Sequence, residues 1–565
     1  MRRFLRAAIL AAVAGAIGTG VYVGLTLPPL SHRLPTPLPP AILYGAYHVH
    51  SDRSDGSGNV DAIAAAAARA GLAFVVFTDH GDATRPPDPP AYRHGVLCLD
   101  GVEISTASGH VVALGLRRVA DYPLAGEARD VIEDIHRLGG WAIAAHPDSP
   151  REELRWRSPA VGVDGLEWIN VDSEWRDEPL ARLAGSALRA LVRPSPAIAT
   201  LFERPARTLA RWDTALRSGP VAGLAAVDAH ARIGWDTNAA EPPAGGLRFP
   251  GYEAMFGTVA QAAVLDKVPT GDPHADAAAI VEALVTGRSY SIVRAFAHPA
   301  SLTFLAERRG VQAGMGGSLD GPGSATVRAD VLEVPGARVT LLRDGRQVAE
   351  GQGSLEIQAD AAGVYRVEVA YAAFGFPWIV SNAIRIGLAP VEAPPSTPPL
   401  PTGKHVPAGV GVPWAVEHDA SSTGSVATEG GELRLQYQLG PGPPSGQYTA
   451  FVTTVSGDAA LDRVRFRARA DRPMRLSLQV RVPGGGPDGR RWRRSIYVDT
   501  TPRLVDVPLS ELEPVGPATA LRPISARVQA VLVVVDTLNT RPGEAGAIWL
   551  SEVALGLGDI DGRRR

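Results

Sequence analysis

The sequence is almost without cysteine, having only Cys98 among its 565 residues. One cysteine excludes an intramolecular disulfide framework and any metal site built from several thiolates. Cys98 lies in the apolar run Gly95–Leu99, which predicts a core position rather than a reactive thiol.

Excess charge is also missing, because 56 Lys and Arg residues face 59 Asp and Glu residues, for a formal net charge of -3. This balance gives no electrostatic reason to expect a nucleic-acid partner. The chain lacks a Gly-x-Ser-x-Gly nucleophile elbow, so a serine hydrolase of that kind is not indicated. Its length predicts three or four domains.

The amino terminus combines a basic head, Met1–Arg6, with an uncharged and mainly apolar run from Ala7 to Leu27. About 20 apolar residues suffice to span a bilayer as a helix, and flanking arginines stay on the cytoplasmic side. We therefore expect residues 1–28 to be a membrane anchor and residues 29–40 to be a proline-rich spacer. The rest of the chain is then expected to be extracytoplasmic. The alternative is a cleaved signal peptide, which would give a secreted protein.

A His-x-His pair, His48 and His50, follows the apolar run Ala41–Leu43, and Asp55 comes five residues later. In a strand, side chains alternate with period two, so we expect both imidazoles on one face. Imidazole and carboxylate groups gathered at a strand end are typical ligands of a divalent metal.

The same ligand types recur at the ends of other apolar runs. His80 follows Phe74–Asp79, Glu103 lies in Val102–Ile104, His110 opens Val111–Leu116, His146 follows Trp141–Ala145, and Asp228 and His230 follow Leu224–Val227. Active sites of parallel α/β sheets and barrels lie at such strand ends. A structural histidine explains any one of these positions, but their recurrence indicates a metal centre.

This ordered set resembles the PHP (polymerase and histidinol phosphatase) metallohydrolases, and within them the CehA/McbA-like branch, over about residues 44–295. The resemblance implies a distorted (β/α)7 barrel, an α/β fold, with two or three divalent ions (Mn, Zn or Fe) and phosphoester hydrolysis. By position it assigns His48, His50, Glu103 and Asp228 to one ion, Glu103, His110 and His146 to a second, and Asp55, His80 and His230 to a third. Many members have histidine where this chain has Asp55, which leaves open whether two ions or three bind.

The expected chemistry is attack by a hydroxide that bridges two ions at Glu103, without a side-chain nucleophile. Glu103, Asp55 and His230 are the candidate catalytic residues. Arg53 and Arg232 adjoin ligands and are candidates for binding a phosphate, and Asp79 and Asp148 are candidates for orienting ligand histidines.

The expected substrate is thus a phosphorylated or ester small molecule. Two alternatives remain open at this point. One is hydrolysis of a carboxylic or carbamic ester by the same site. The other is a non-catalytic barrel that serves as a scaffold, with β domains that bind a glycan or a protein partner.

Helices are expected over 60–70, 128–138 and 277–286, the last with Asp276 as its N-cap. His136 should lie on the solvated face of its helix. Residues 178–217, rich in arginine and broken near Pro194–Pro196 and Pro205, are expected to be a solvated helical insertion. A strand over 287–293 would close the barrel.

The barrel domain is expected to cover 41–296, and period-two apolar patterns then predict two all-β sandwich domains. The first covers 297–388. A proline-rich linker over 389–405 separates it from a jelly-roll-like domain over 406–565, for which a carbohydrate is a candidate ligand.

Overall fold

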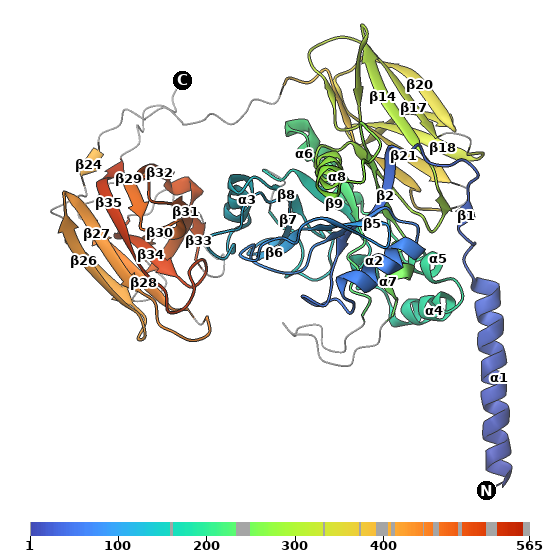
Figure 1. Cartoon of the computed structure of the whole chain (residues 1–565), viewed down its shortest axis with the longest axis horizontal. Coiled ribbons are helices and arrows are strands. Elements are labelled where there is room, and N and C mark those ends of the chain that lie inside the picture. The colour runs from blue at the N-terminus through green and yellow to red at the C-terminus, as the bar shows by residue number, and fades with distance from the viewer. Residues whose placement is uncertain are drawn as a thin grey trace. The chain divides into compact units, whose positions relative to one another are not determined.

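A computed structural model describes residues 2–158, 162–232, 249–331, 334–371, 374–390, 405–407, 413–444, 446–455, 463–483, 489–515 and 528–556 (Figure 1). This part of the chain is mostly β-sheet, with several sandwich-like sheets and eight α-helices. The chain forms two compact units. Unit 1 is Met1–Gly81, Arg85–Arg118 and Ile132–Glu392, and unit 2 is Asp82–Thr84, Val119–Val131 and Ala393–Arg565.

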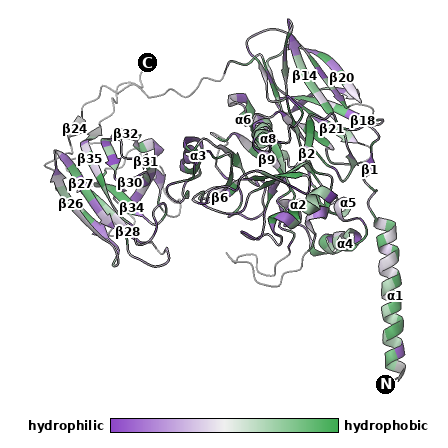
Figure 2. Cartoon of the chain, viewed as in Figure 1, coloured by the Kyte–Doolittle hydropathy of each residue, from purple (hydrophilic) through white to green (hydrophobic). Residues whose placement is uncertain are grey.

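Helix α1 (Arg2–Thr26) is the expected apolar helix. Its stretch Phe4–Thr26 is long and apolar enough to cross a membrane, a test that a signal sequence also passes. Apolar side chains cover it all round and are exposed, for example Phe4 and Leu25, and Figure 2 shows its predominantly hydrophobic colouring.

The first part of unit 1 alternates strands with helices. Its strands are β1 (His32–Arg33), β2 (Ile42–Val49), β3 (Phe74–Phe77), β4 (Ala91–Arg93), β5 (Val96–Asp100), β6 (Val102–Thr106), β7 (Gly109–Leu114), β8 (Trp141–Ala144), β9 (Gly165–Asn170), β10 (Ala222–Ala226), β11 (Ala260–Val264), β12 (Ser289–Ile292) and β13 (Ala297–His298). Its helices are α2 (Val60–Arg69), α4 (Leu180–Ala190), α5 (Pro194–Ala199), α6 (Ala206–Ser218), α7 (Tyr252–Phe256) and α8 (Pro273–Val285). Helix α3 (Ala128–Arg137) begins in unit 2 and continues in unit 1 from Ile132. One 3-10 helix covers Ser173–Trp175.

Two sheets are joined where both edges of the first meet β2 and the residues after β3 of the second. One has the order β10-β9-β8-β7-β6, and the other contains the path β11-β2-β3-β5-β4. Bridges between His80 and Glu103, and between Val49 and Ala229, connect the first sheet to the second. Consequently β2, β3, the β5–β6 segment, β7, β8, β9 and β10 follow one another as neighbours around a ring.

Gly101 provides the bend between β5 and β6. A Cβ atom there would lie 2.7 Å from Leu114 Cδ2 and 2.9 Å from the Ala113 carbonyl oxygen, so a side chain does not fit. The ring strands pack on α8 through a buried cluster that includes Phe74, Val112 and Ile280. Cys98 is buried, as expected, and burial raises its pKa to about 11.

Two local predictions were wrong. Helix α8 starts at Pro273 rather than at 277, because Asp272 accepts the capping hydrogen bond from His274 N while the Asp276 carboxylate binds Thr270 N instead. Strand β12 pairs with β11 and with β22 (Ile379–Ser381), so it leads into the following sheets instead of closing the ring.

The second part of unit 1 consists of β-strands. They are β14 (Leu302–Arg308), β15 (Val311–Gly314), β16 (Ser318–Leu319), β17 (Ala325–Val331), β18 (Ala337–Arg343), β19 (Arg346–Gln352), β20 (Ser354–Ala359), β21 (Gly363–Tyr371), β22 and β23 (Ile384–Ile386). Arg366 of β21 is buried and binds Asp213 of α6 through Nε–Oδ1 at 2.7 Å and Nη2–Oδ2 at 2.9 Å. This forked ion pair ties the strands to the helical segment.

Unit 2 is a sandwich of two sheets, ordered β26-β27-β35-β29-β32 with β24 on β35, and β25-β28-β34-β30-β31-β33. Their bounds are β24 (His405–Pro407), β25 (Trp414–His418), β26 (Thr423–Glu429), β27 (Glu432–Gln438), β28 (Tyr448–Thr454), β29 (Arg463–Ala470), β30 (Met474–Val482), β31 (Arg490–Val498), β32 (Arg503–Pro508), β33 (Glu513–Pro514), β34 (Ala530–Asp536) and β35 (Ala545–Gly556). A 3-10 helix covers Leu509–Glu511. The core between the sheets includes Leu435, Phe466 and Leu478.

Candidate metal centre

The nine predicted ligands converge at one edge of the ring, and the strand directions explain why. His48, His50, His80, His146, Asp228 and His230 lie at or just beyond the carboxyl ends of β2, β3, β8 and β10. Strand β7 pairs antiparallel with both β6 and β8, so its beginning, with His110, lies at the same edge. A β7 strand parallel to β8 would have placed His110 at the opposite edge.

Three of these residues have left-handed backbone conformations. The φ angles are +67° at His48, +31° at His146 and +48° at Asp228. Such values are uncommon outside glycine and gather at functional sites, where surrounding structure holds them. The pairing of β2 with β3 shifts between Ala46 and Val49, so His48 sits in an irregularity rather than in a regular strand. The two imidazoles still meet, with 3.1 Å between His48 Nε2 and His50 Nε2.

Glu103 lies at the centre of the cluster, with its two oxygens facing different histidines. Oε1 is 2.7 Å from both His110 Nδ1 and His146 Nε2. Oε2 is 3.2 Å from His48 Nε2 and from His50 Nε2, and 3.3 Å from His80 Nδ1. The carboxylate therefore has the arrangement required to serve two ions at once.

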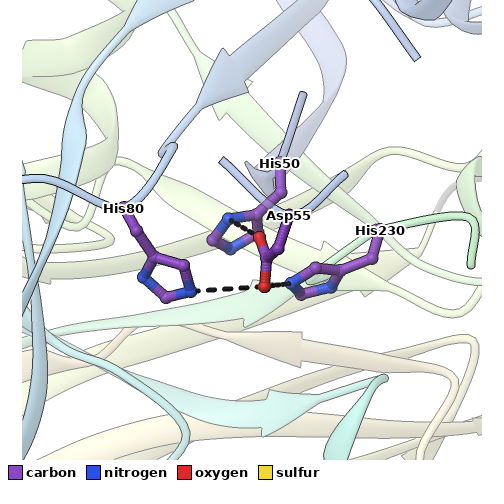
Figure 3. Close-up of side chains that lie close together, drawn as sticks. All are labelled: His50, Asp55, His80 and His230. Carbon is purple, nitrogen blue, oxygen red and sulfur yellow. Dashed lines mark ion pairs between the residues drawn. The ribbon is translucent and has the colours of Figure 1, made fainter. Parts of the chain in front are cut away.

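Asp55 is the centre of the neighbouring group, shown in Figure 3. Its Oδ1 lies 3.2 Å from His50 Nδ1, and its Oδ2 lies 3.1 Å from His230 Nε2 and 3.5 Å from His80 Nε2. The three rings come from the ends of β2, β3 and β10.

Four groups of residues could each hold a metal ion, because within each group the ligand atoms all lie within 4.8 Å of one another. They are His50, Asp55, His80 and His230; His48, His146 and Asp228; His48, His50 and Glu103; and His80, Glu103 and His110. Together they include all nine predicted ligands, although the grouping differs from the one the resemblance implied. Nitrogen and carboxylate donors of this kind suit Zn, Mn or Fe.

The hydrogen bonds of the rings fit a metal. His48 Nδ1 faces Glu167 Oε1 at 2.5 Å, His146 Nδ1 faces the Leu154 carbonyl at 2.9 Å, and His230 Nδ1 faces the Asp228 carbonyl at 3.1 Å. Carbonyl and carboxylate oxygens only accept, so each of these nitrogens donates and the Nε2 lone pair points into the cluster. Asp228 Oδ1 is buried and accepts no hydrogen bond from the described residues.

Burial makes the charges of the site strongly interdependent. Burial alone would raise the pKa of Glu103, but His80, His48 and His110 hold that pKa well below its usual range. Burial opposes protonation of His48, yet the carboxylates of Asp228, Glu167 and Glu103 raise its pKa well above the usual value. The cluster thus favours bound positive charge, which a divalent cation supplies in place of protons.

Glu167 and Asn170 also belong to the site, although neither is among the residues predicted from the sequence. Glu167 Oε2 accepts from His146 N at 2.7 Å and from Asn170 Nδ2 at 2.9 Å. Asn170 Nδ2 also donates to Asp228 Oδ2 at 3.0 Å. The available signal was a glutamate inside the strand 166–170, a position that is rarely acidic unless the charge has a partner.

Asp79 binds the loop after β2 rather than a ligand histidine. It accepts from Ser51 N and Ser51 Oγ, both at 2.7 Å, and from Ser54 Oγ at 2.8 Å. These hydrogen bonds of Asp79 fix the loop that carries Asp55. Asp148 lines a separate pocket with Glu174 and Arg204.

The two candidate arginines differ in position. Arg53 forms ion pairs with Asp88 and, at 3.7 Å, with Asp100. Arg232 lines a cavity of about 420 Å³ together with Asp228 and His230. His136 is half-exposed on α3, as expected, with Nε2 2.8 Å from Asp164 Oδ2.

Comparisons with known proteins give partial matches. No protein-family model matches the chain. A Methanocaldococcus jannaschii protein named "Uncharacterized protein MJ1587" is 32% identical over 108 residues, which are 19% of this chain and 62% of that protein. The match therefore spans less than two thirds of that relative's length.

Solved structures that align with the chain include carbohydrate-binding modules. The family 11 module of the cellulase Lic26A-Cel5E of Clostridium thermocellum is 14% identical at a TM-score of 0.23, over 28% of this chain and 95% of the module. The agarase AgWH50C is 12% identical at a TM-score of 0.20, over 28% of this chain and 25% of the agarase. A mutant of the family 29 carbohydrate-binding module CBM29-2 is 13% identical at a TM-score of 0.19, over 28% of this chain and 94% of the module.

Proposed function

We propose that this chain is a metal-dependent phosphoesterase with a PHP-type barrel, anchored in a membrane by α1 and exposed on the extracytoplasmic side. The observation that carries the proposal is the position of Glu103, whose two oxygens each face different histidines at 2.7 to 3.3 Å. The ring of seven neighbouring strands supports a barrel, and the basic head before the apolar run supports the orientation.

Divalent ions held by the nine ligands would acidify water and neutralise charge on phosphoryl oxygens. The protein's own residues prepare the site. Glu167, the Leu154 carbonyl and the Asp228 carbonyl fix three rings with Nε2 directed inward. Tyr252 donates its hydroxyl hydrogen to the His50 carbonyl and accepts from Ser57 N, which secures the loop carrying Asp55.

The cavity beside the centre offers the substrate a place. Because Asp228 and His230 line it, a substrate bound there would bring its scissile bond to these ligands. His230 is only partly buried and joins the Asp55 group to this space, which suits a role next to the reacting atoms.

The test uses the full chain purified in phosphate-free lipid. Metal content is measured, and turnover is assayed on a phosphomonoester, a phosphodiester, an aryl carboxylic ester and a carbamate. We expect at least two ions per chain, and phosphoester hydrolysis that a chelator abolishes and Mn²⁺ or Zn²⁺ restores. Metal-replete protein that cleaves only the carboxylic or carbamic ester would overturn the phosphoesterase assignment, and a chain without metal would overturn the mechanism.

A further inference from the structure

The cavity beside the metal centre has mainly apolar walls. Leu183, Ile198 and Met255 contribute to them, from α4, α5 and α7. A volume of about 420 Å³ is in the range of small-molecule sites. Contact between apolar walls and hydrocarbon removes apolar surface from water, which is favourable, whereas contact with a phosphate group brings no such gain. A wholly polar phosphoester would therefore leave most of this surface without a favourable contact.

Helix α4 forms one side of the cavity and has an unusual composition. Residues 179–202 contain three arginines, Arg182, Arg189 and Arg193, and no acidic residue, while Arg182 forms ion pairs with the flanking Glu178 and Glu203. At its ends Leu180, Leu191 and Val192 are 83%, 74% and 58% exposed. A short basic helix with exposed apolar side chains is typical of segments that lie in a membrane interface. We expected a solvated helical insertion from the sequence and did not predict these exposed apolar side chains.

Helix α4 also packs against the end of the apolar helix α1, as Figure 1 shows. The Tyr22 hydroxyl lies 2.8 Å from the place that a Cβ at Gly185 would take, so the two helices are in close contact. Arg193 donates a hydrogen bond to the Pro28 carbonyl, just beyond the end of α1. Tyr22 is about 6 Å before the end of α1, the depth at which tyrosines gather at membrane interfaces.

We propose that the cavity receives the hydrocarbon chain of a membrane amphiphile, whose phosphoester is the substrate of the metal centre. The position of α4 lets the chain enter from the bilayer, while Asp228 and His230 mark where the head group arrives. This inference rests on the proposed phosphoesterase function and adds the substrate class. In the reaction one water is consumed, one P–O ester bond of the amphiphile breaks, a P–O bond to the water oxygen forms, and a water proton passes to the oxygen of the leaving group.

The test places the full chain in vesicles of a phosphate-free galactolipid. Its substrates are 4-nitrophenyl phosphodiesters with ethyl, hexyl or decyl chains. Each methylene that enters the cavity should raise kcat/KM by up to about fourfold. Ala187→Phe narrows the cavity, so the decyl-to-ethyl ratio of kcat/KM should fall by at least about tenfold, the value of two methylenes.

Ala181→Phe is the matched control, because Ala181 is exposed on the same helix and does not line the cavity among the described residues. Ala181→Phe should keep the wild-type decyl-to-ethyl ratio of kcat/KM. Any part of this ratio that arises from partition of the substrate into the vesicles is the same in all three proteins. Binding of ethyl and decyl phosphonate is measured on the same three proteins and does not require turnover.

The outcomes separate the two proposals. Phosphodiester turnover with the same chain-length ratio in Ala187→Phe as in wild type would overturn the hydrocarbon cavity and leave the phosphoesterase standing. Absence of turnover here and of all phosphoesters in the preceding assay, with decyl phosphonate bound more tightly than ethyl by wild type and not by Ala187→Phe, would support the cavity and overturn the phosphoesterase. Absence of both would overturn both.

Discussion

Glu167 holds His48 by a contact of 2.5 Å between Oε1 and Nδ1, at a position where both side chains are fully buried. The carboxylate fixes the ring tautomer and raises the basicity of the Nε2 that faces the cluster. Its other oxygen accepts from the backbone N–H of His146, so one glutamate orients two of the nine candidate ligands.

We expect Glu167→Gln to lower metal affinity or turnover by about 10 to 100-fold. An amide has only one accepting oxygen, so its NH2 group would face either His48 Nδ1–H or His146 N–H. Two hydrogen-bond donors would then face each other, and one of the two hydrogen bonds would be lost. Metal content and kcat/KM measure the effect. Glu253→Gln, which removes the same charge from an exposed pair with Arg69, is the control. Equal losses in both variants would mean that Glu167 does not orient the ligands.

The clustering of the candidate ligands was predictable because all of them except Asp55 lie in or beside an apolar run, and the strand pattern is local. Glu167 and Asn170 could not be found in the same way, since their partners, His48 and Asp228, are distant in sequence. The irregularity at His48 and the reversed direction of β7 depend on pairing between strands, which one strand's own residues do not specify. The apolar face of α4 escaped prediction because its arginines suggested a solvated helix.

Glu103→Gln should reduce metal content at two groups and lower turnover by more than about a hundredfold, because even outer partners of ligands contribute 10 to 100-fold. An amide of the same size carries no negative charge and offers one oxygen, so it serves one ion poorly and cannot bridge. His136→Ala is the control, since it removes only an exposed pair with Asp164, worth at most about 1 kcal/mol. Normal metal content and turnover in Glu103→Gln would refute the bridge.

Asp55→Asn tests whether two ions or three bind. Asp55 contacts His50, His80 and His230 but none of the groups around His146, so loss of its charge should affect one ion. We expect the metal content to fall by one equivalent, with the ions near Glu103 retained. Unchanged stoichiometry would indicate that the Asp55 group holds no ion in the wild-type protein.

Acid should destabilise unit 1 through His298. Burial and the guanidinium groups of Arg294 and Arg33 lower the pKa of His298 to about 3, whereas the unfolded value is about 6.5. Between these values the unfolded chain binds a proton that the folded chain excludes, so the free energy of unfolding falls as the pH falls, by at most about 1.4 kcal/mol per pH unit.

Urea unfolding at pH 7 and pH 5 should therefore show a smaller pH effect in His298→Asn than in wild type. His274→Asn, at an exposed position on α8, is the control variant. If His298→Asn and wild type lose the same stability between the two pH values, His298 is not the group that titrates.

Truncation after residue 390 tests the linker. All nine candidate ligands belong to unit 1, but Val119–Val131, which the sequence placed in the barrel domain, belongs to unit 2. There Asp130 is buried, with Arg475 3.8 Å away and an ion pair to Arg494, and Asn539 donates to the Pro123 carbonyl at 2.9 Å. Truncation removes these partners.

The truncated chain should therefore retain its metal and the slow amide exchange of β2, β3 and β8, while exchange in 119–131 accelerates. The physical reason is that the ring strands keep their backbone partners, whereas the segment 119–131 loses the contacts from Arg475, Arg494 and Asn539 that hold it. Asn539→Ala in the full chain, which removes only the hydrogen bonds to the carbonyls of Pro123 and Ala125, should accelerate the same segment less. Loss of metal, or fast exchange in the ring strands, would show that the barrel depends on the last domain and that the stretch 389–405 is not a boundary between independent parts.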